Sequence, residues 1–129
     1  MDTVSEFLTR IRNAGLAKHE KVDVPSSNMR VGIATILQKG GYIRSFKVAR
    51  DNRQGMMRVY LRYSANGEPM IRNIQRISRP GLRTYVSARD IPSVRNGFGT
   101  SVLSTSKGIM DAEDAKSSNL GGELLFQVW

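Results

Sequence analysis

Apolar residues at helical spacing predict two amphipathic helices in the first half of the chain. The first begins at Thr3, which opens a Thr-x-x-Glu capping box, and ends at Gly15. The second is capped by Ser26 or Ser27 and stops at Gly40-Gly41. The two apolar stripes comprise Val4, Phe7, Leu8 and Ile11 in the first helix, and Met29, Ile33, Ile36 and Leu37 in the second. Each stripe predicts one buried helix face.

Alternating apolar and polar residues predict three strands in the same half, at residues 22–24, 43–48 and 56–63. Residues 51–55 are expected to form the turn between the last two strands. The third strand directs Arg58, Tyr60 and Arg62 to one face, opposite its apolar residues. An aromatic ring between guanidinium groups is suited to stacking on nucleic-acid bases. The alternative is an ordinary solvated sheet surface.

Residues 64–69, Ser-Ala-Asn-Gly-Glu-Pro, are the only convincing linker in the sequence. They divide the chain into an amino-terminal domain, 1–65, with the order α-β-α-β-β, and a strand-rich carboxy-terminal domain, 66–129. In the second domain we expect strands at 71–77, 82–86, 100–103 and 123–128, helical turns at 90–96, and a short helix capped by Asp111. The pattern therefore predicts an α+β protein made of two small lobes.

A Pro80-Gly81 pair carries candidate binding chemistry in the second domain. Proline followed by glycine predicts a type II turn, with Arg79 before it and Arg83 just after it. Arg83 then shares a strand face with Tyr85. Guanidinium groups interleaved with an aromatic ring suit RNA, and a structural turn with solvated arginines is the alternative.

A second polar stretch, Ser104-Thr105-Ser106-Lys107-Gly108, follows an apolar strand. The three hydroxyls can each donate and accept hydrogen bonds, so they can meet phosphate oxygens, ribose hydroxyls or base edges. Lys107 adds a point charge for phosphate, and Gly108 allows positive φ. This chemistry suits the binding of a folded RNA, although many ordinary loops have the same composition.

Composition adds a strong and uneven positive charge. The 129 residues include 20 Lys and Arg against 11 Asp and Glu, which gives a net charge of +9. The span from residue 44 to residue 83 holds ten basic residues and only two acidic ones. An anionic membrane would select cations on one helical face, whereas these arginines fall in strands and turns. The charge therefore favours a nucleic acid as the partner.

Other classes of function find little support in the sequence. The chain has no cysteine and one histidine, His19, so we expect no metal site and no cofactor. Ser104 and Lys107 match a Ser-x-x-Lys nucleophile motif, but the Ser-Asp-Asn and Lys-Thr-Gly motifs that accompany it are absent. We expect no enzyme activity. No long apolar run or secretory signal is visible, so we expect no membrane partner and a cytoplasmic location.

Five ordered motifs together resemble one known protein family. They are residues 8–14 (Leu-Thr-Arg-Ile-Arg-Asn-Ala), 25–27 (Pro-Ser-Ser), 77–83 (Ile-Ser-Arg-Pro-Gly-Leu-Arg), 104–108 (Ser-Thr-Ser-Lys-Gly) and 121–123 (Gly-Gly-Glu). Over essentially the whole chain, their order and spacing are similar to those of bacterial-type small-subunit ribosomal protein number eight. The resemblance implies a two-domain α+β protein that binds the central domain of small-subunit ribosomal RNA and helps its assembly.

The resemblance also implies which residues contact RNA. In that family the carboxy-terminal domain makes the principal contact, and the stretch 104–108 takes this role here. Tyr85 and the Gly121-Gly122 turn match positions near the same RNA. The amino-terminal domain makes a second contact, for which Arg30, expected on the outer side of the second helix, and Arg12 are the candidates.

The expected partners follow from the same resemblance. Besides ribosomal RNA, they are small-subunit ribosomal protein five, other neighbouring ribosomal proteins, and a structure in the messenger of its own operon. The alternative function is that of a free RNA-binding translational repressor without a permanent place in the ribosome. Both functions would use the same surface.

Overall fold

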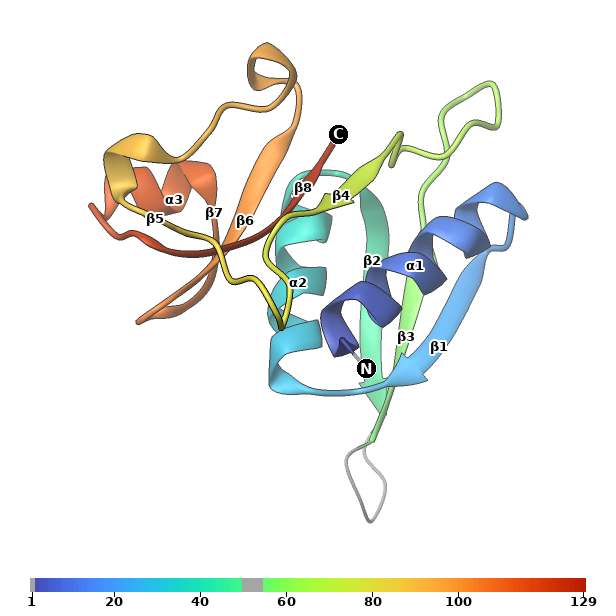
Figure 1. Ribbon diagram of the computed structural model, residues 1–129. Coiled ribbons are helices and arrows are strands. Elements are labelled where there is room, and N and C mark those ends of the chain that lie inside the picture. The colour runs from blue at the N-terminus through green and yellow to red at the C-terminus, as the bar shows by residue number, and fades with distance from the viewer. Residues whose placement is uncertain (1, 50–54) are drawn as a thin grey trace. The chain divides into compact units, whose positions relative to one another are not determined.

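The chain folds into two compact units, shown in Figure 1. This computed structural model describes residues 2–49 and 55–129, so the predicted turn at 51–55 lies largely outside the described residues. The first unit is Thr3–Arg72, and the second is Asn73–Trp129 together with Asp2. Helices and antiparallel sheets occur in both units, which confirms the predicted α+β class.

The predicted linker at 64–69 is part of the first unit, because the division falls after Arg72 and not after residue 65. The segment folds into a tight turn in which the Ser64 backbone N–H donates to the Glu68 carbonyl at 2.8 Å. Tyr63 then forms an isolated bridge with Pro69. The sequence at 64–69 therefore forms a turn within the first unit.

The first unit contains two helices and a three-stranded sheet. Its elements are α1 (Thr3–Leu16), β1 (Lys21–Pro25), α2 (Asn28–Lys39), β2 (Ile43–Ala49) and β3 (Met56–Leu61). The sheet is antiparallel in the order β1-β3-β2, which leaves β1 and β2 as edge strands. Met57 and Val59 of β3 are fully buried on one face, whereas Met56 and Arg58 are exposed on the other.

The apolar stripe of α1 is confirmed, since Val4, Phe7, Leu8 and Ile11 are all buried. The predicted end at Gly15 is wrong by one residue, because the helix continues to Leu16. Gly15 is buried within the helix, and a Cβ at this position would lie 3.5 Å from the Cβ of Pro69. The 64–69 turn therefore packs closely against α1, at an ordinary contact distance that would also admit a Cβ.

The buried stripe of α2 begins at Arg30 and not at Met29. Ser27 caps the helix by accepting a hydrogen bond from the Arg30 N–H at 3.2 Å, which resolves the choice between two serines. Met29 is 38% exposed, whereas Arg30 is only 6% exposed. The expectation that Arg30 lies on the outer side of this helix is therefore wrong.

The second unit is built on a five-stranded antiparallel sheet. Its strands are β4 (Ile74–Arg76), β5 (Tyr85–Val86), β6 (Thr100–Thr105), β7 (Gly108–Asp111) and β8 (Gly122–Val128). The order is β4-β8-β6-β7, with β5 also paired to β8. The helical pieces are η1 (Ala88–Asp90), η2 (Arg95–Gly97) and α3 (Ala112–Ser117). The strands predicted at 71–77 and 82–86 are shorter than expected.

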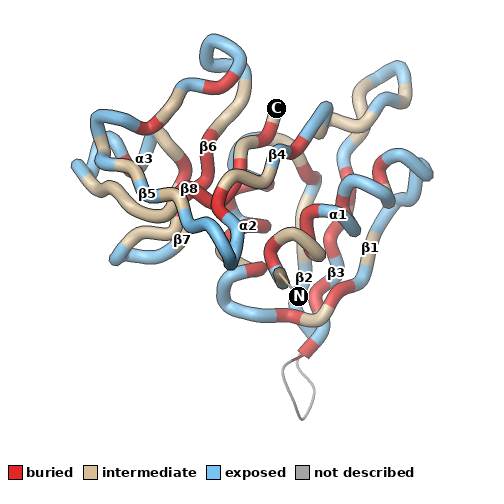
Figure 2. Tube along the Cα trace, in the orientation of Figure 1, coloured by how far each residue is buried: buried red, intermediate tan, exposed pale blue. Residues whose placement is uncertain are grey.

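One core cluster packs on one face of this sheet. It consists of Ile91, Leu103, Ala115 and Leu124, with Ile77, Val86, Met110 and Ala112 partly buried around it. Asp111 caps α3 as predicted, because its Oδ1 accepts from the Asp114 N–H at 2.8 Å. Figure 2 shows buried segments along β6 and β8 and an exposed turn between β6 and β7.

Candidate nucleic-acid interface

The predicted Ser-Thr-Ser-Lys-Gly loop is a tight β-hairpin. Thr105 pairs with Gly108 across β6 and β7, so only Ser106 and Lys107 form the turn. Gly108 has a φ of 106°, a conformation that residues with a Cβ rarely adopt. The glycine therefore allows the chain to reverse within two residues, and the turn is exposed at its tip.

The Thr105 hydroxyl is used inside the hairpin. It donates to the Gly108 carbonyl at 2.9 Å and accepts from the Lys107 N–H at 3.1 Å. The sulfur of Met110 lies 3.2 Å from the same oxygen. The three hydroxyls of the stretch are therefore not equivalent: Thr105 holds the turn in shape.

The hydroxyls of Ser104 and Ser106 differ from that of Thr105. Within the described residues, neither hydroxyl has a hydrogen-bond partner. Ser106 and Lys107 are exposed, and Ser104 is partly buried. These two hydroxyls and the Lys107 ammonium group are the parts of the hairpin that remain available to a ligand.

Strand register brings Ser104 into one row with Tyr85. Tyr85 on β5 pairs with Glu123 on β8, and Glu123 pairs with Ser104 on β6, which in turn pairs with Ile109 on β7. Directly paired residues in antiparallel strands direct their side chains to the same face. The row therefore lies on the face opposite the core cluster, to which the next residue, Leu103, belongs. We call these four residues the cross-strand row.

Glu123 at the centre of the row is held by two donors. The buried Ser78 hydroxyl donates to its Oε2 at 2.5 Å, and the Arg83 guanidinium donates to the same atom at 3.0 Å. Burial alone would raise the pKa of Glu123, but the hydrogen bonds from Ser78 and Arg83 and the positive charges of Arg83 and Arg76 together outweigh it, so the pKa lies below its ordinary value. The carboxylate therefore fixes Arg83 beside Tyr85.

Gly121 and Gly122 let the start of β8 approach two neighbouring backbones. A Cβ on Gly122 would lie 2.2 Å from the carbonyl oxygen of Ser104. A Cβ on Gly121 would lie 2.4 Å from the carbonyl oxygen of Val86. Any larger residue would push β8 away from β6 or from the end of β5. The two glycines thus allow β8 to lie close enough to β5 and β6 for the cross-strand row to form. This role does not depend on any contact of the glycines with a ligand.

The Pro80-Gly81 turn presents the remaining candidates. Arg79 and Leu82 exchange two backbone hydrogen bonds of 3.1 and 2.9 Å, which closes a two-residue turn. Gly81 is not among the glycines with positive φ, so the predicted type II turn is wrong. Arg79 and Arg83 are both exposed, as are Leu82 and Tyr85 at 76% and 69%.

Arg30 is committed to the first unit itself. Its guanidinium donates to the carbonyls of Pro25 at 2.9 Å and Thr3 at 3.2 Å. It also lies over the ring of Phe7, with 5.6 Å from Cζ to the ring centroid. This arrangement ties α1, β1 and α2 together. The RNA contact of Arg30 stays a prediction. The groups that Arg30 contacts in the structure all belong to the first unit itself.

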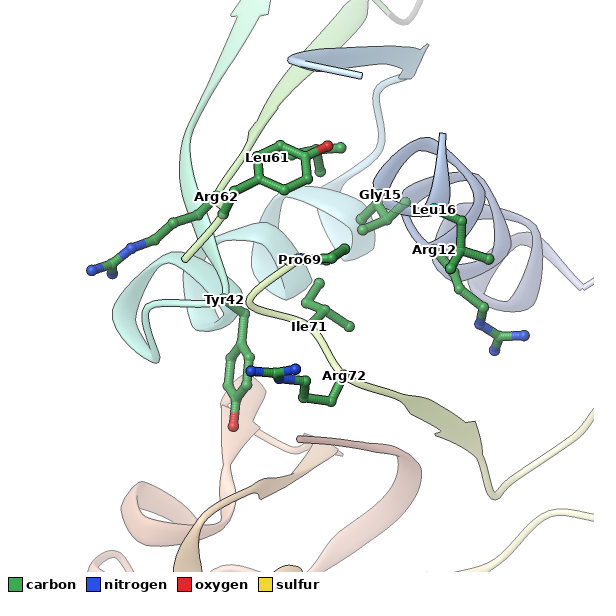
Figure 3. Close-up of a pocket in the computed structure, with 11 residues that line it drawn as sticks. Arg12, Gly15, Leu16, Tyr42, Leu61, Arg62, Pro69, Ile71 and Arg72 are labelled. Atoms are coloured by element: carbon green, nitrogen blue, oxygen red, sulfur yellow. The ribbon is translucent and has the colours of Figure 1, made fainter. Parts of the chain in front are cut away.

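Arg12 lies at the rim of a small pocket in the first unit (Figure 3). The pocket has a volume of about 40 Å³, so it holds little more than one water molecule. Pro69 and Ile71 face Gly15 and Leu16 across it, while the Arg12 side chain extends away from them. The guanidinium of Arg12 is therefore directed outward, as a surface contact requires.

Glu123 and Ser78 are the parts of this site that the sequence did not assign. Glu123 follows Gly121-Gly122, and Ser78 precedes Arg79, so both lay within motifs already singled out. An acidic residue next to glycines and a serine next to a turn gave no sign that the two would meet across the sheet. The pairing of β5, β8 and β6 creates their contact.

The described residues lack a metal-ligand cluster and a membrane-spanning helix. In residues 2–49 and 55–129, no group of three or more His, Cys, Asp or Glu side chains is placed to hold a metal ion. None of the helices in this described part of the chain is both long enough and apolar enough to cross a membrane.

The fold and the site together define a small, basic α+β protein with an exposed polar hairpin. The family model for ribosomal protein S8 matches residues 2–129. A protein from Bdellovibrio bacteriovorus called small ribosomal subunit protein uS8 is 60% identical over 129 residues, covering 100% of both chains. Proteins of the same name from Geotalea uraniireducens and Lactobacillus helveticus are 53% and 48% identical, each covering 99% of this chain and 97% of theirs. The chain belongs to the ribosomal protein S8 family, which confirms the resemblance seen in its motifs.

Proposed function

We propose that this protein is a structural component of the small ribosomal subunit that binds directly to the central domain of its RNA and helps that RNA to assemble. The observation that carries the proposal is the cross-strand row. It aligns the unpartnered hydroxyl of Ser104 with Tyr85, and the exposed Arg83 is hydrogen-bonded to Glu123 in the same row. The net charge of +9 and the membership of a ribosomal protein family support it.

The chemistry of the hairpin suits recognition of RNA shape. Paired RNA hides its major groove and displays ribose hydroxyls in a shallow minor groove, while irregular helices also expose unpaired bases. Ser104 and Ser106 can donate to or accept from these groups, and the Lys107 ammonium suits phosphate. The Tyr85 ring offers a surface for stacking. Arg79 and Arg83 attract phosphates without reading the sequence.

The proposed partners are ribosomal RNA and neighbouring proteins of the subunit, among them small-subunit ribosomal protein five. A structure in the messenger of its own operon would bind the same residues if it presents the same groups as the ribosomal site. We place the protein in the ribosome and therefore in the cytoplasm.

The test is a double substitution, Ser104→Ala with Ser106→Ala, assayed for binding to a fragment of central-domain small-subunit RNA. Two neutral hydroxyl contacts, at about 0.5–1.5 kcal/mol each, predict a loss of affinity of about 5- to 150-fold. The matched control is Ser93→Ala with Ser118→Ala, two exposed serines that do not belong to the row. Equal affinities for both double variants would refute the role of the hairpin.

A second measurement separates the ribosomal role from that of a free repressor. A structural component should sediment with small subunits after a wash in high salt. A protein that is found only in the unbound fraction, yet still binds the RNA fragment, would instead be a free RNA-binding protein. The double variant of Ser104 and Ser106 should show reduced sedimentation in the same wash.

A further inference from the structure

The sheet of the first unit has one face that neither helix covers. Register places three residues of each strand on this face: Lys21, Asp23 and Pro25 on β1, Tyr60, Arg58 and Met56 on β3, and Ser45, Lys47 and Ala49 on β2. We call it the outer sheet face. The opposite face carries the buried residues Met57 and Val59, and α1 lies across that part of the unit in Figure 1.

Tyr60 lies on the central strand of the outer sheet face, near one end of that strand, and two cations lie against its ring. The Cζ of Arg44, at the irregular step between Ile43 and Ser45, lies 5.2 Å from the centroid of the Tyr60 ring. The ammonium nitrogen of Lys47 lies 5.9 Å from it. A planar guanidinium held on an aromatic ring forms a flat, positively charged platform on which a base can stack.

The acids on this face are already paired. Asp23 accepts from Arg58 through both carboxylate oxygens, at 2.8 and 3.1 Å, and Glu20 lies 3.8 Å from the Arg44 guanidinium. The Arg58 hydrogen bond is also the main reason why the pKa of Asp23 is lowered, so this carboxyl remains charged and bonded at neutral pH. The cations outnumber the acids here, and the face as a whole is positive.

A shallow hollow of about 580 Å³ runs beside Tyr60, within the range of ligand sites. Met56, which is 44% exposed, supplies apolar surface in it, next to Lys47 and Arg58. Protein interfaces are depleted of charge at their centre, whereas three charged residues, Asp23, Lys47 and Arg58, are among those that line this hollow. Aromatic and apolar surface between cations is the composition of a groove for single-stranded nucleic acid.

We propose that the outer sheet face is a separate binding surface for single-stranded RNA, in which a base stacks on the Tyr60–Arg44 platform and Lys47 and Arg58 contact the flanking phosphates. The inference does not depend on the hairpin of the second unit, because no residue of the cross-strand row takes part. It assigns a role to the Arg58 and Tyr60 face that the ribosomal RNA contact at Ser104 and Ser106 leaves unused.

The test measures the affinity of the full chain for a single-stranded oligouridylate of about 12 nucleotides, by fluorescence anisotropy at several salt concentrations. Tyr60→Leu should weaken binding about tenfold, and Tyr60→Phe should retain it. Arg44→Lys keeps the charge but loses the plane, so it should also weaken binding. Lys47→Gln should mainly reduce the dependence on salt.

Photocrosslinking locates the contact directly. An oligouridylate that carries 4-thiouridine should crosslink to the tryptic peptide 59–62, which contains Tyr60. The peptide 84–89, which contains Tyr85, reports the hairpin site in the same experiment. Crosslinks on 59–62 that persist in the double variant Ser104→Ala and Ser106→Ala support an independent surface.

Several outcomes would overturn the inference. Equal affinity of the Tyr60→Leu variant and the wild type would exclude stacking, and so would an Arg44→Lys variant that binds normally. Crosslinks confined to 84–89 would place the RNA at the hairpin alone. If Tyr60→Leu reduced incorporation into small subunits but left the oligouridylate affinity unchanged, the face would bind a protein. The unfolding midpoint of each variant serves as the control for folding.

Discussion

The hydroxyl of Thr105 donates to the carbonyl of Gly108 at 2.9 Å, across the two residues of the turn that separate them. The same hydroxyl accepts from the Lys107 N–H at 3.1 Å. One side chain therefore satisfies two backbone groups in an exposed hairpin. Such a turn presents Ser106 and Lys107 in one shape before any ligand arrives, which reduces the entropy that binding must remove.

Thr105→Val should accordingly weaken RNA binding although Thr105 needs no contact with RNA. The valine keeps the shape of the side chain but removes both hydrogen bonds, at about 0.5–1.5 kcal/mol each. Thr105→Ser keeps the hydroxyl and should bind almost normally. Affinity for the central-domain RNA fragment is the measurement. A valine variant that binds like the serine variant would show that the turn does not need this hydroxyl.

Gly122→Ala should destabilise the second unit. Its Cβ would meet the Ser104 carbonyl oxygen at 2.2 Å, and the nearby atoms are backbone, which cannot move aside cheaply. We expect a loss of about 1–3 kcal/mol or more in the free energy of unfolding. Gly81→Ala is the matched control, because nothing lies within 4 Å of its Cβ position. Urea denaturation distinguishes them, and two equal midpoints would contradict the steric argument.

Arg30→Met should reduce stability more than it reduces contact with RNA. The methionine keeps an apolar stem but leaves the Pro25 and Thr3 carbonyls without their donor, at a cost of about 2–3 kcal/mol. Arg79→Met is the matched exposed change and should alter stability by less than about 0.5 kcal/mol. RNA affinity should fall instead in the Arg79 variant. Equal stability of the two variants would show that the buried contacts of Arg30 contribute little.

Glu123 predicts a specific dependence of stability on pH. Burial raises the pKa of Glu123, but the hydrogen bonds from Ser78 and Arg83 and the charges of Arg83 and Arg76 together bring it below the ordinary value of 4.5. The folded state therefore favours the charged carboxylate, and the resulting stability is fully present above about pH 5. It is lost as the pH falls through the lowered pKa. Glu123→Gln should flatten this acid-side decline in urea denaturation between pH 6 and pH 3. An unchanged slope would refute the assignment.

Local patterns predicted the helices well. The α1 stripe and the Asp111 cap depend on residues within a few positions of one another, so the sequence alone specifies them. The sequence analysis assigned Met29 to the buried stripe of α2, because Met29 and Arg30 are both at spacings that can continue this stripe and methionine is the apolar residue of the two. The distant Thr3 carbonyl, which accepts from Arg30, decides between them.

The site itself was predicted only in part. Charge and hydroxyl content pointed to Ser104, Ser106, Arg83 and Tyr85 as candidates, and the structure brings Tyr85 and Ser104 into one row. That row is set by the register of β8, which pairs with strands on both sides. Register is a property of strands that are distant in sequence, so spacing along the chain could not reveal that Glu123 lies between the two.

Glu123 places a negatively charged carboxylate between Tyr85 and Ser104 in the cross-strand row of this basic protein. A carboxylate accepts hydrogen bonds from ribose hydroxyls and from base amino groups, but it repels phosphate. An RNA strand crossing the row between Tyr85 and Ser104 must therefore present its sugar or base edges at this point and keep its phosphates to either side. Glu123, which holds Arg83, thus also restricts the path that a nucleic acid can take across the row. Attraction by arginines alone would not provide this selectivity.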